Sequence, residues 1–212
     1  MVKDQLFRHN VRDEPVLRAM SIVPREAFVP EQYQNMAYAD SPLPIPAGQT
    51  ISQPYVVAYM LELLDLQPGD KALEIGSGSG YAAAIMSRIV TEVHAVERHK
   101  ELVAYSRERL EDLGYGNVTV HHGDGTVGWE KDGPFDAILV SAGGPRVPQA
   151  LKAQLAPGGR LVMPVGRKAR SQVLVKVIRS QCGDFRREEH GLVAFVPLIG
   201  EAGWNEQDAE RE

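Results

Sequence analysis

The stretch Leu73-Glu74-Ile75-Gly76-Ser77-Gly78-Ser79-Gly80 decides how this chain folds. It continues an apolar run that begins at Lys71 and predicts a buried strand, and it precedes a helical pattern that begins at Tyr81. Glycines suit the turn between them because the backbone needs a positive φ there and because a side chain would keep a ligand away. A strand, a glycine turn and a helix N-terminus together form a binding site for a nucleotide-like ligand.

The spacing of the glycines separates two classes of nucleotide-binding protein. The NAD fingerprint G-x-G-x-x-G would place its last glycine at position 81, where this chain has Tyr81. Here the spacing is G-x-G-x-G, and Glu74 stands two residues before Gly76. This combination is the pattern associated with S-adenosylmethionine-dependent methyltransferases. The alternative is a glycine turn that packs a helix onto a sheet and binds no ligand.

Two acidic residues further along the chain favour ligand binding. Glu97 is expected at the carboxyl end of the next strand, where an acid accepts hydrogen bonds from ribose hydroxyls. Its alternative role is a surface ion pair with Arg98 or Lys100. The segment Gly123-Asp124-Gly125 ends the third expected strand, where Asp124 can turn its carboxylate or backbone toward an adenine amino group. A simple turn is the alternative, because Asp and Gly dominate turns.

Length, charge and cysteine content exclude several classes of protein. The chain has 212 residues, a net charge of −5 and one cysteine, Cys182. This length suits a single domain with a substantial core. One cysteine excludes an intrachain disulfide and a multi-cysteine zinc site. The mildly acidic balance argues against a general affinity for nucleic acid.

The histidines and the hydropathy pattern limit the function further. The six histidines, His121 and His122 among them, show no metal-ligand spacing with carboxylates or cysteine, so we expect strand-end or surface histidines and no metal. The first ten residues are too polar for a signal peptide. The longest apolar stretch, residues 55–64, is broken by Glu62 and too short to cross a bilayer. The expected location is therefore the cytoplasm, without membrane association.

The remaining pattern predicts one α/β domain over residues 1–212. Residues 1–52 are expected to form an N-terminal helical cap and an acceptor-side loop, residues 53–200 the α/β core, and residues 201–212 a frayed tail. The cap has an amphipathic helix over residues 12–23, and a proline-rich segment over residues 38–52 excludes a helix or a central strand.

The core pattern alternates strands and helices, which predicts a doubly wound, Rossmann-like parallel sheet. Apolar segments without a helix between them then predict an antiparallel pair at the C-terminal end. The strand order at that end stays open. The expected strands are residues 71–75, 92–96, 118–121, 135–141 and 160–165, with the pair at 172–178 and 191–197; the expected helices are residues 52–64, 81–89, 100–113 and 147–155.

Ser52 has two interpretations. As the N-cap of the helix expected over residues 52–64, it has a structural reason to be there. It also ends the proline-rich segment at a helix N-terminus, where the dipole favours an anion such as a substrate carboxylate. No histidine and aspartate pair with Ser52 in a recognisable motif, so we reject a hydrolase.

Six segments spread over nearly the whole chain resemble the protein-L-isoaspartate (D-aspartate) O-methyltransferase family. The glycine loop alone is shared by many methyltransferases, whereas Gly-Gln-Thr-Ile-Ser and Phe-Val-Pro-Leu are far more particular to this family. The matching segments are residues 23–30, 42–52, 73–81, 123–125, 154–166 and 195–198.

The resemblance implies an enzyme that repairs damaged proteins. Such an enzyme methylates the free α-carboxylate of L-isoaspartyl and D-aspartyl residues with S-adenosylmethionine, giving S-adenosylhomocysteine. The ester collapses to a succinimide, and hydrolysis then returns some normal aspartate. A carboxylate is already ionised at neutral pH and needs no general base, so catalysis would depend mainly on alignment and desolvation.

The resemblance also assigns roles to residues of this chain. Ser52 takes the catalytic position and is expected to position the carboxylate rather than attack it. Where some family members carry a histidine five residues after the serine, this chain has Val57. The implied substrate contacts are Thr50, Ile51, Ser52 and Val196; the implied cofactor contacts are Glu74, Gly76, Ser77, Gly78, Gly80, Glu97, Arg98, Asp124 and Gly125.

Other functions fit the glycine loop less well. One is an S-adenosylmethionine-dependent methyltransferase that acts on a small molecule or RNA, and another is a non-catalytic cofactor-binding module of the same fold. An NAD dehydrogenase is disfavoured by the glycine spacing. The expected partners are isoaspartyl-containing proteins and peptides, and the sequence offers no obvious oligomer interface, which favours a monomer.

Overall fold

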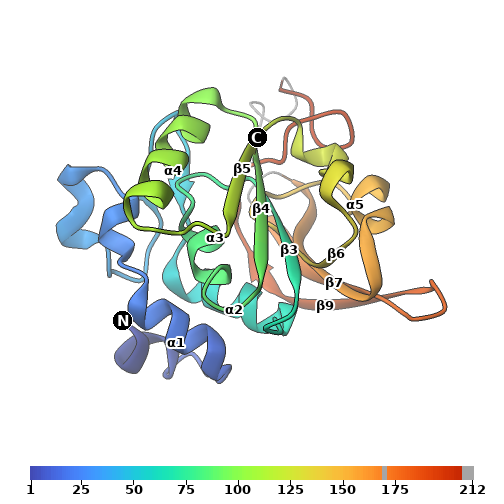
Figure 1. The fold of residues 1–212 in the computed structure, drawn as a ribbon, viewed down its shortest axis with the longest axis horizontal. Helices are drawn as coiled ribbons and strands as arrows, with labels where there is room; N and C mark the ends of the chain where they lie inside the picture. Colours follow the sequence, from blue (N-terminus) through green and yellow to red (C-terminus); the bar gives the residue numbers. More distant parts are fainter. Residues whose placement is uncertain (169–170, 207–212) are drawn as a thin grey trace.

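A seven-stranded sheet forms the centre of the molecule in the computed structural model, which describes residues 1–168 and 171–206 (Figure 1). Its strand order is β5-β4-β3-β6-β7-β8-β9. The pairs from β5 to β7 are parallel, and β8 and β9 add two antiparallel pairs at one edge. The strands are β3 (Lys71–Ile75), β4 (Glu92–Glu97), β5 (Val118–His122), β6 (Phe135–Val140), β7 (Leu155–Lys168), β8 (Ser171–Arg179) and β9 (Phe185–Val193).

Helices cover both faces of this sheet, and the N-terminal cap packs on one of them. The core on one face includes residues of α1 to α4, and the core on the other includes Leu151 of α5. The helices are α1 (Glu14–Ile22), α2 (Pro54–Leu64), α3 (Tyr81–Met86), α4 (Lys100–Asp112) and α5 (Gln149–Ala153). Shorter elements are η1 (Val2–Leu6), η2 (Arg25–Phe28), η3 (Glu31–Met36), η4 (Gly125–Val127) and η5 (Glu130–Asp132).

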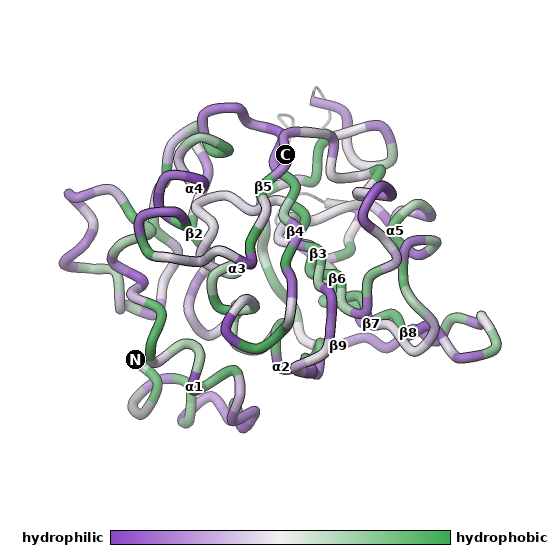
Figure 2. Tube along the Cα trace, viewed as in Figure 1, coloured by the Kyte–Doolittle hydropathy of each residue, from purple (hydrophilic) through white to green (hydrophobic). Residues whose placement is uncertain are grey.

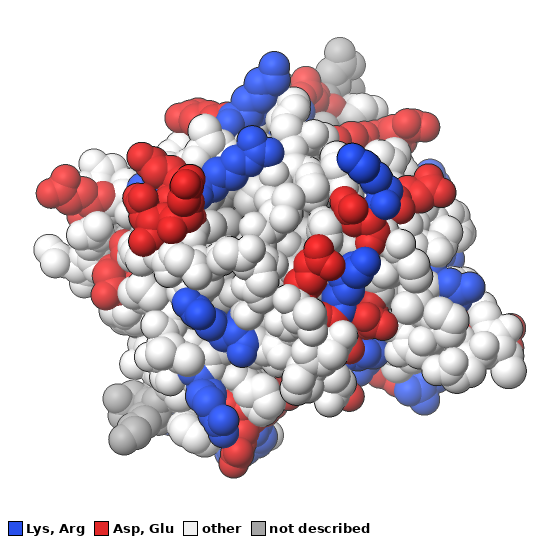
Figure 3. Space-filling model, in the orientation of Figure 1, with Lys and Arg blue, Asp and Glu red and all other residues white. Residues whose placement is uncertain are grey.

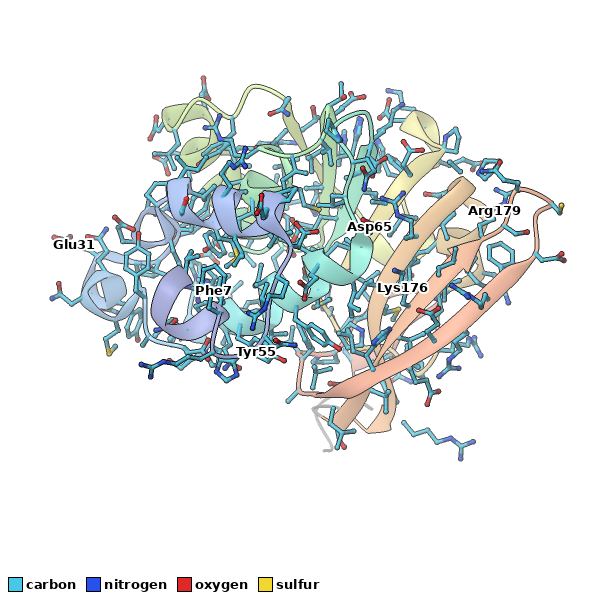
Figure 4. The ribbon with its side chains drawn as sticks, turned by 90° about the horizontal axis from the view of Figure 1, so that it is seen from below. Phe7, Glu31, Tyr55, Asp65, Lys176 and Arg179 are labelled. Carbon is cyan, nitrogen blue, oxygen red and sulfur yellow. The ribbon has the colours of Figure 1, made fainter. Side chains whose placement is uncertain are left out.

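The central parallel strands β3 and β6 are mostly apolar because both of their faces are buried, whereas the edge strand β5 is partly exposed and ends in two histidines. Along β3, Ala72 joins the core under the N-terminal cap, whereas Leu73 and Ile75 join the core beside α5. The hydrophobic colour of the central strands in Figure 2 shows the same pattern. In Figure 4, Phe7 of the cap and Tyr55 of α2 are seen on the opposite side of the view from Lys176 and Arg179 of β8.

The doubly wound sheet with antiparallel strands at its end is confirmed, but the partner of β8 begins and ends earlier than predicted: only its last residues, through Val193, fall in the predicted segment. Residues 191–197 were expected to pair with β8, whereas β9 spans Phe185–Val193. Its sequence, Phe-Arg-Arg-Glu-Glu-His-Gly-Leu-Val, lacks the apolar pattern from which strands are predicted. Charged side chains are common on an exposed edge strand because they prevent pairing with another chain. Residues 194–197 instead follow β9, and Pro197 bridges Gly143 beside β6.

Two other expected boundaries are wrong around β7. The helix expected over residues 147–155 ends at Ala153, and Leu155 already pairs with Phe135. Residues 157–159, expected to form a turn before β7, instead lie within β7. They shift the pairing register of β7 with β6 between the pair Phe135–Leu155 and the pair Ala137–Arg160. A local Pro-Gly-Gly signal therefore interrupts the ladder without ending the strand.

The two ends of the chain also have local structure. Within the proline-rich segment, β1 (Leu43–Pro44) and β2 (Thr50–Ile51) form a short antiparallel pair. At the C-terminal end, Trp204 donates from Nε1 to the Gly143 carbonyl over 3.0 Å. Residues 207–212 of the predicted frayed tail lie outside the described residues, so fraying there stays a prediction. In the part of the chain that the structure describes, no helix is both long and apolar enough to cross a membrane.

Candidate active site

The site lies where the strand order reverses. From β3 the chain continues outward through β4 and β5, and it then returns to β6 on the other side of β3. In such sheets a crevice opens at the carboxyl ends of the strands at this switch point. The glycine loop follows β3, and Ser141 follows β6 directly beside it.

The glycine loop has the backbone conformation that its sequence predicts. Gly76, Gly78 and Gly80 have φ values of 80°, 52° and 88°, in the left-handed region that favours glycine. A Cβ on Gly78 would lie 3.3 Å from Ile45, and one on Gly80 would lie 3.2 Å from Ser106 and Leu110. Side chains at these positions would therefore strain the backbone and crowd their neighbours.

Glu97 ends β4 and fixes the glycine loop. Its side chain is buried, and its carboxylate accepts hydrogen bonds from the Gly78 N–H over 3.0 Å and from the His99 N–H over 2.9 Å. A carboxylate has about four lone-pair sites, so these two bonds leave acceptor capacity for ribose hydroxyls. The alternative role, a surface ion pair with Arg98 or Lys100, is not among the ion pairs of the described residues.

Glu74 is the most perturbed carboxyl group in the site. It is buried; Oε1 accepts a 3.0 Å hydrogen bond from the Ser141 hydroxyl, and Oε2 has no partner among the described residues. Burial raises the pKa of Glu74 to about 8, and the nearby Glu97 carboxylate adds to this rise, whereas the Ser141 bond opposes it. An orphaned, buried carboxyl oxygen is a binding feature for a cationic or hydrogen-donating ligand.

Two adjoining cavities occupy the crevice. The larger, of about 270 Å³, is lined by the glycine loop, by Glu97, Arg98 and Gly125, and by Val196 from the C-terminal segment. The smaller, of about 40 Å³, is lined by Ser52 and Ile51 and by Glu74 and Ser77. The residues shared by both cavities are Thr50, Gly76, Gly78 and Ser141. A ligand in the larger cavity would therefore lie next to the Ser52 cavity.

Ser52 is not the N-cap of α2, which corrects the structural interpretation of this residue. The N-cap is Gln53, and no side chain of the cap residue bonds to the helix. Asp40 of the proline-rich segment instead accepts from the Tyr55 N–H over 3.1 Å and from Gln53 Nε2 over 2.9 Å. The Ser52 hydroxyl has no hydrogen bond to any described residue, so it is available to a ligand.

A buried arginine holds the backbone of Ser52. Arg25 is fully buried and donates from Nε to the Ala37 carbonyl and from a terminal nitrogen to the Ser52 carbonyl, both over 2.7 Å. Its guanidinium lies 4.9 Å from the ring centroid of Tyr81, the first residue of α3. Burial lowers the pKa of Arg25, and Tyr81 opposes this shift. Arg25 thus connects the proline-rich segment to the helix that follows the glycine loop.

Comparison with known proteins identifies the family. The model of the family described as protein-L-isoaspartate(D-aspartate) O-methyltransferase matches residues 1–203. Protein-L-isoaspartate O-methyltransferase 2 of Pelobacter propionicus is 55% identical over 204 residues, which cover 96% of this chain and 91% of that protein. The chain belongs to the protein-L-isoaspartate O-methyltransferase family.

Other members of the family agree. A Rhodopseudomonas palustris protein-L-isoaspartate O-methyltransferase is 53% identical over 208 residues, which cover 98% of this chain and 95% of that protein. The crystal structure of a Plasmodium falciparum family member, in complex with S-adenosyl-L-homocysteine, has a TM-score of 0.80 and 29% identity. That match covers 93% of this chain and 96% of the other. The predicted fold class and family are thereby confirmed.

The carboxylate of Asp124 is bonded within the protein. One carboxylate oxygen accepts from the N–H and the hydroxyl of Thr126, and the other accepts from the Glu201 N–H over 2.8 Å. Burial would raise the pKa of Asp124, but these hydrogen bonds outweigh it and lower the pKa. Gly125, not Asp124, lines the larger cavity. The carboxylate therefore fixes the loop that presents Gly125, and direct contact with the cofactor stays a prediction.

The other predicted residues divide between the two cavities. Arg98 lines the larger cavity and forms an ion pair with Glu206, which lines it too. Ser77 lines the smaller cavity, where its hydroxyl is buried and has no partner among the described residues. Gly80 lines neither cavity; it caps α3. The structure thus gathers the predicted residues around the two cavities, and a contact of Gly80 with the cofactor stays a prediction.

Arg25 and Ser141 were not predicted from the sequence. Ser141 directly follows a parallel strand next to β3, so the rule on strand ends at the switch point is a signal that points to it. Arg25 lies in the segment 23–30 that resembles the family, but nothing in its local sequence announces a fully buried arginine. Only the packing of the cap shows its contacts with Ala37 and Ser52.

Proposed function

We propose that this chain transfers a methyl group from S-adenosylmethionine to the free α-carboxylate of L-isoaspartyl and D-aspartyl residues in damaged proteins and peptides. The observation that carries this function is the pair of adjoining cavities, one built on the glycine loop and one containing Ser52. The resulting ester cyclises to a succinimide, which releases methanol, and hydrolysis returns part of it to aspartate. This is the activity of the family to which the chain belongs.

The larger cavity fits the cofactor. The backbone of Gly76 and Gly78 permits close approach, and Glu97 offers acceptor capacity for ribose hydroxyls. Glu74 lines the adjoining smaller cavity, where its orphaned oxygen suits the cationic group of a cofactor that reaches across the shared wall. Ser77, Arg98 and Gly125 line the same two cavities. When bound, S-adenosylmethionine would supply a methyl group carried by a positively charged sulfur; the methyl group passes to an acceptor carboxylate oxygen, and the sulfur leaves as a neutral thioether.

The smaller cavity fits the acceptor carboxylate. The Ser52 hydroxyl has no bond to a described residue and can donate to a carboxylate oxygen, while Arg25 holds the Ser52 backbone. Thr50, Ile51 and Val196 line the cavities on the acceptor side and would contact the residues around the damaged linkage. The carboxylate is ionised at neutral pH, so Ser52 orients it and removes no proton. Rate enhancement then arises mainly from alignment.

The expected partners follow from the surface. On the face shown in Figure 3, acidic and basic side chains are interspersed and form no continuous basic patch, which supports a protein substrate over a nucleic acid. The net charge of −5 has the same implication. We propose a monomer that acts on isoaspartyl proteins in the cytoplasm, without nucleic acid or membrane partners.

A paired-peptide assay tests this function. The protein is incubated with methyl-labelled S-adenosylmethionine and either an isoaspartyl peptide or its aspartyl twin. We expect base-labile label on the isoaspartyl peptide only, because only that linkage has a free α-carboxylate beside the chain. Cofactor binding with label on neither peptide would contradict the proposal and favour a small-molecule methyltransferase or a non-catalytic module.

A further inference from the structure

A cluster of three metal-binding side chains lies outside the cavities of the active site. His94 in the middle of β4, His121 of β5 and Asp132 of η5 have ligand atoms that all lie within 4.8 Å of one another. His94 is buried, which corrects the expectation that the histidines lie only at strand ends or on the surface, and His121 and Asp132 are partly exposed. The adjacent strands bring together two histidines that are far apart in the sequence.

The distances in this cluster suit coordination of one ion. His94 Nδ1 lies 3.0 Å from His121 Nε2 and 3.5 Å from Asp132 Oδ2. Zn²⁺ binds imidazole nitrogen and carboxylate oxygen at about 2.0–2.2 Å, so neighbouring ligand atoms around it lie about 2.9–3.4 Å apart. The two rings are nearly parallel, with an interplanar angle of 5° and centroids 5.3 Å apart, so one ring must turn to direct both facing nitrogens at the same ion.

A second layer of groups supports these three side chains. His94 Nε2, on the other side of the ring, lies 3.1 Å from Glu92 Oε1 and makes no hydrogen bond with the described residues, so Glu92 is near enough to become its partner when an ion binds Nδ1. Trp129 donates from Nε1 to Asp132 over 2.7 Å, and its ring stacks on His121 at 4.0 Å. A carboxylate behind a histidine ligand and a donor to the carboxylate ligand are typical outer-shell contacts of metal sites.

We propose that His94, His121 and Asp132 bind a divalent transition-metal ion. The two-nitrogen, one-oxygen ligand set favours ions such as Zn²⁺ over Mg²⁺ and Ca²⁺, which prefer oxygen ligands. Asp132 is exposed enough for an ion to enter and for water to complete the coordination. The ion joins β4, β5 and η5, so its binding stabilises the folded chain.

Zinc titration of a metal-free protein tests the proposal. The protein carries no histidine tag, is freed of metal with a chelator, and has the exposed Cys182 replaced (Cys182→Ser) to remove a competing ligand. We expect one equivalent of Zn²⁺ to bind in calorimetry and to raise the thermal midpoint, and Mg²⁺ to do neither. Co²⁺ in place of Zn²⁺ should give a visible absorption spectrum of nitrogen and oxygen ligands.

Substitutions decide whether the cluster is the binding site. His121→Ala should weaken Zn²⁺ binding by more than about 100-fold, and Glu92→Gln should weaken it by about 10- to 100-fold through the outer shell. His122→Ala removes the next histidine of β5, which bonds to the Arg98 carbonyl instead, and should leave Zn²⁺ binding unchanged. Absence of stoichiometric binding to the parent protein, or equal binding by His121→Ala and His122→Ala, would overturn the proposal and leave a proton-sharing histidine pair.

Discussion

The donor and acceptor halves of this active site are built in different ways. The donor half consists of groups at the ends of neighbouring parallel strands: the glycine loop after β3, Glu97 at the end of β4 and Ser141 after β6. The acceptor half consists of irregular segments outside the sheet, where Arg25 holds the Ser52 carbonyl and the segment after β9 contributes Val196. Sheet topology thus fixes one half, and a buried side chain in the cap fixes the other.

This difference predicts separable functions. A change in the donor half should weaken cofactor binding, because its groups face the larger cavity. A change in the acceptor half should slow methyl transfer and leave cofactor binding intact. The two halves touch through Tyr81, on which Arg25 stacks, and through the residues shared by the two cavities. Substitutions on each side of that contact measure how independent the halves are.

Glu97→Ala should have the largest effect on the donor half. Two backbone N–H groups, those of Gly78 and His99, lose a charged acceptor whose bonds contribute about 1.5–3 kcal/mol each. We expect the affinity for S-adenosylhomocysteine, measured by calorimetry, to fall by more than about 100-fold. Glu101→Ala, in the exposed first turn of α4, is the matched control and should bind like wild type. Wild-type affinity in Glu97→Ala would place the ribose elsewhere.

Ser52→Ala tests the acceptor half. A hydroxyl that bonds to a charged carboxylate contributes about 1.5–3 kcal/mol, so kcat/KM for an isoaspartyl peptide should fall about 10- to 100-fold. Cofactor affinity should not change. Ser41→Ala, in the same proline-rich segment but outside both cavities, should keep full activity. Unchanged peptide turnover in Ser52→Ala would remove Ser52 from the mechanism.

Arg25→Lys tests how the acceptor half is held. A single ammonium cannot bond to the Ala37 and Ser52 carbonyls as the planar guanidinium does, and a buried carbonyl without its donor costs about 1–3 kcal/mol. We expect a lower thermal midpoint and a fall of about tenfold in kcat/KM at unchanged cofactor affinity. Arg18→Lys on the exposed side of α1 is the control. An equal loss of cofactor affinity would mean that the two halves are not separable.

The donor half could be predicted from the sequence because local patterns determine it. The glycines need positive φ, and the run before them predicts β3, so the position of Glu97 follows from the next strand of a parallel sheet. The predicted capping role of Ser52 was wrong because no local pattern determines how the start of α2 is capped. Asp40, thirteen residues before Gln53, reaches the helix start, and no local pattern announces that contact.

The C-terminal end shows the same limit. The apolar signal at residues 191–197 found only the end of the edge strand β9, which begins at Phe185 and is mostly charged, because hydrogen bonding to β8 requires no apolar face at a sheet edge. Asp124 was correctly placed at the end of β5, and its bond to Thr126 is the local cap of η4, but its bond to Glu201 depends on how the chain end packs. Long-range packing, not local propensity, decides these details.

Glu74 gives the smallest expected effect and tests whether the donor half binds a cation beside its orphaned oxygen. Burial raises the pKa of Glu74 to about 8, so the free protein holds a proton there at neutral pH. A cation favours the charged carboxylate, so affinity for S-adenosylmethionine should rise about fivefold from pH 7 to pH 8, with proton release. The same raised pKa makes the free protein less stable as pH rises from the ordinary value of 4.5 towards 8.

Calorimetry in buffers of different ionisation enthalpy measures the released proton directly. Glu74→Gln keeps an acceptor for the Ser141 hydroxyl but has no proton to release, so its affinity should stay level between pH 7 and pH 8. An identical pH dependence in wild type and Glu74→Gln would assign the titration to another group. In that case the cation of the cofactor would lie away from Glu74, and the boundary between the two halves would lie elsewhere in the crevice.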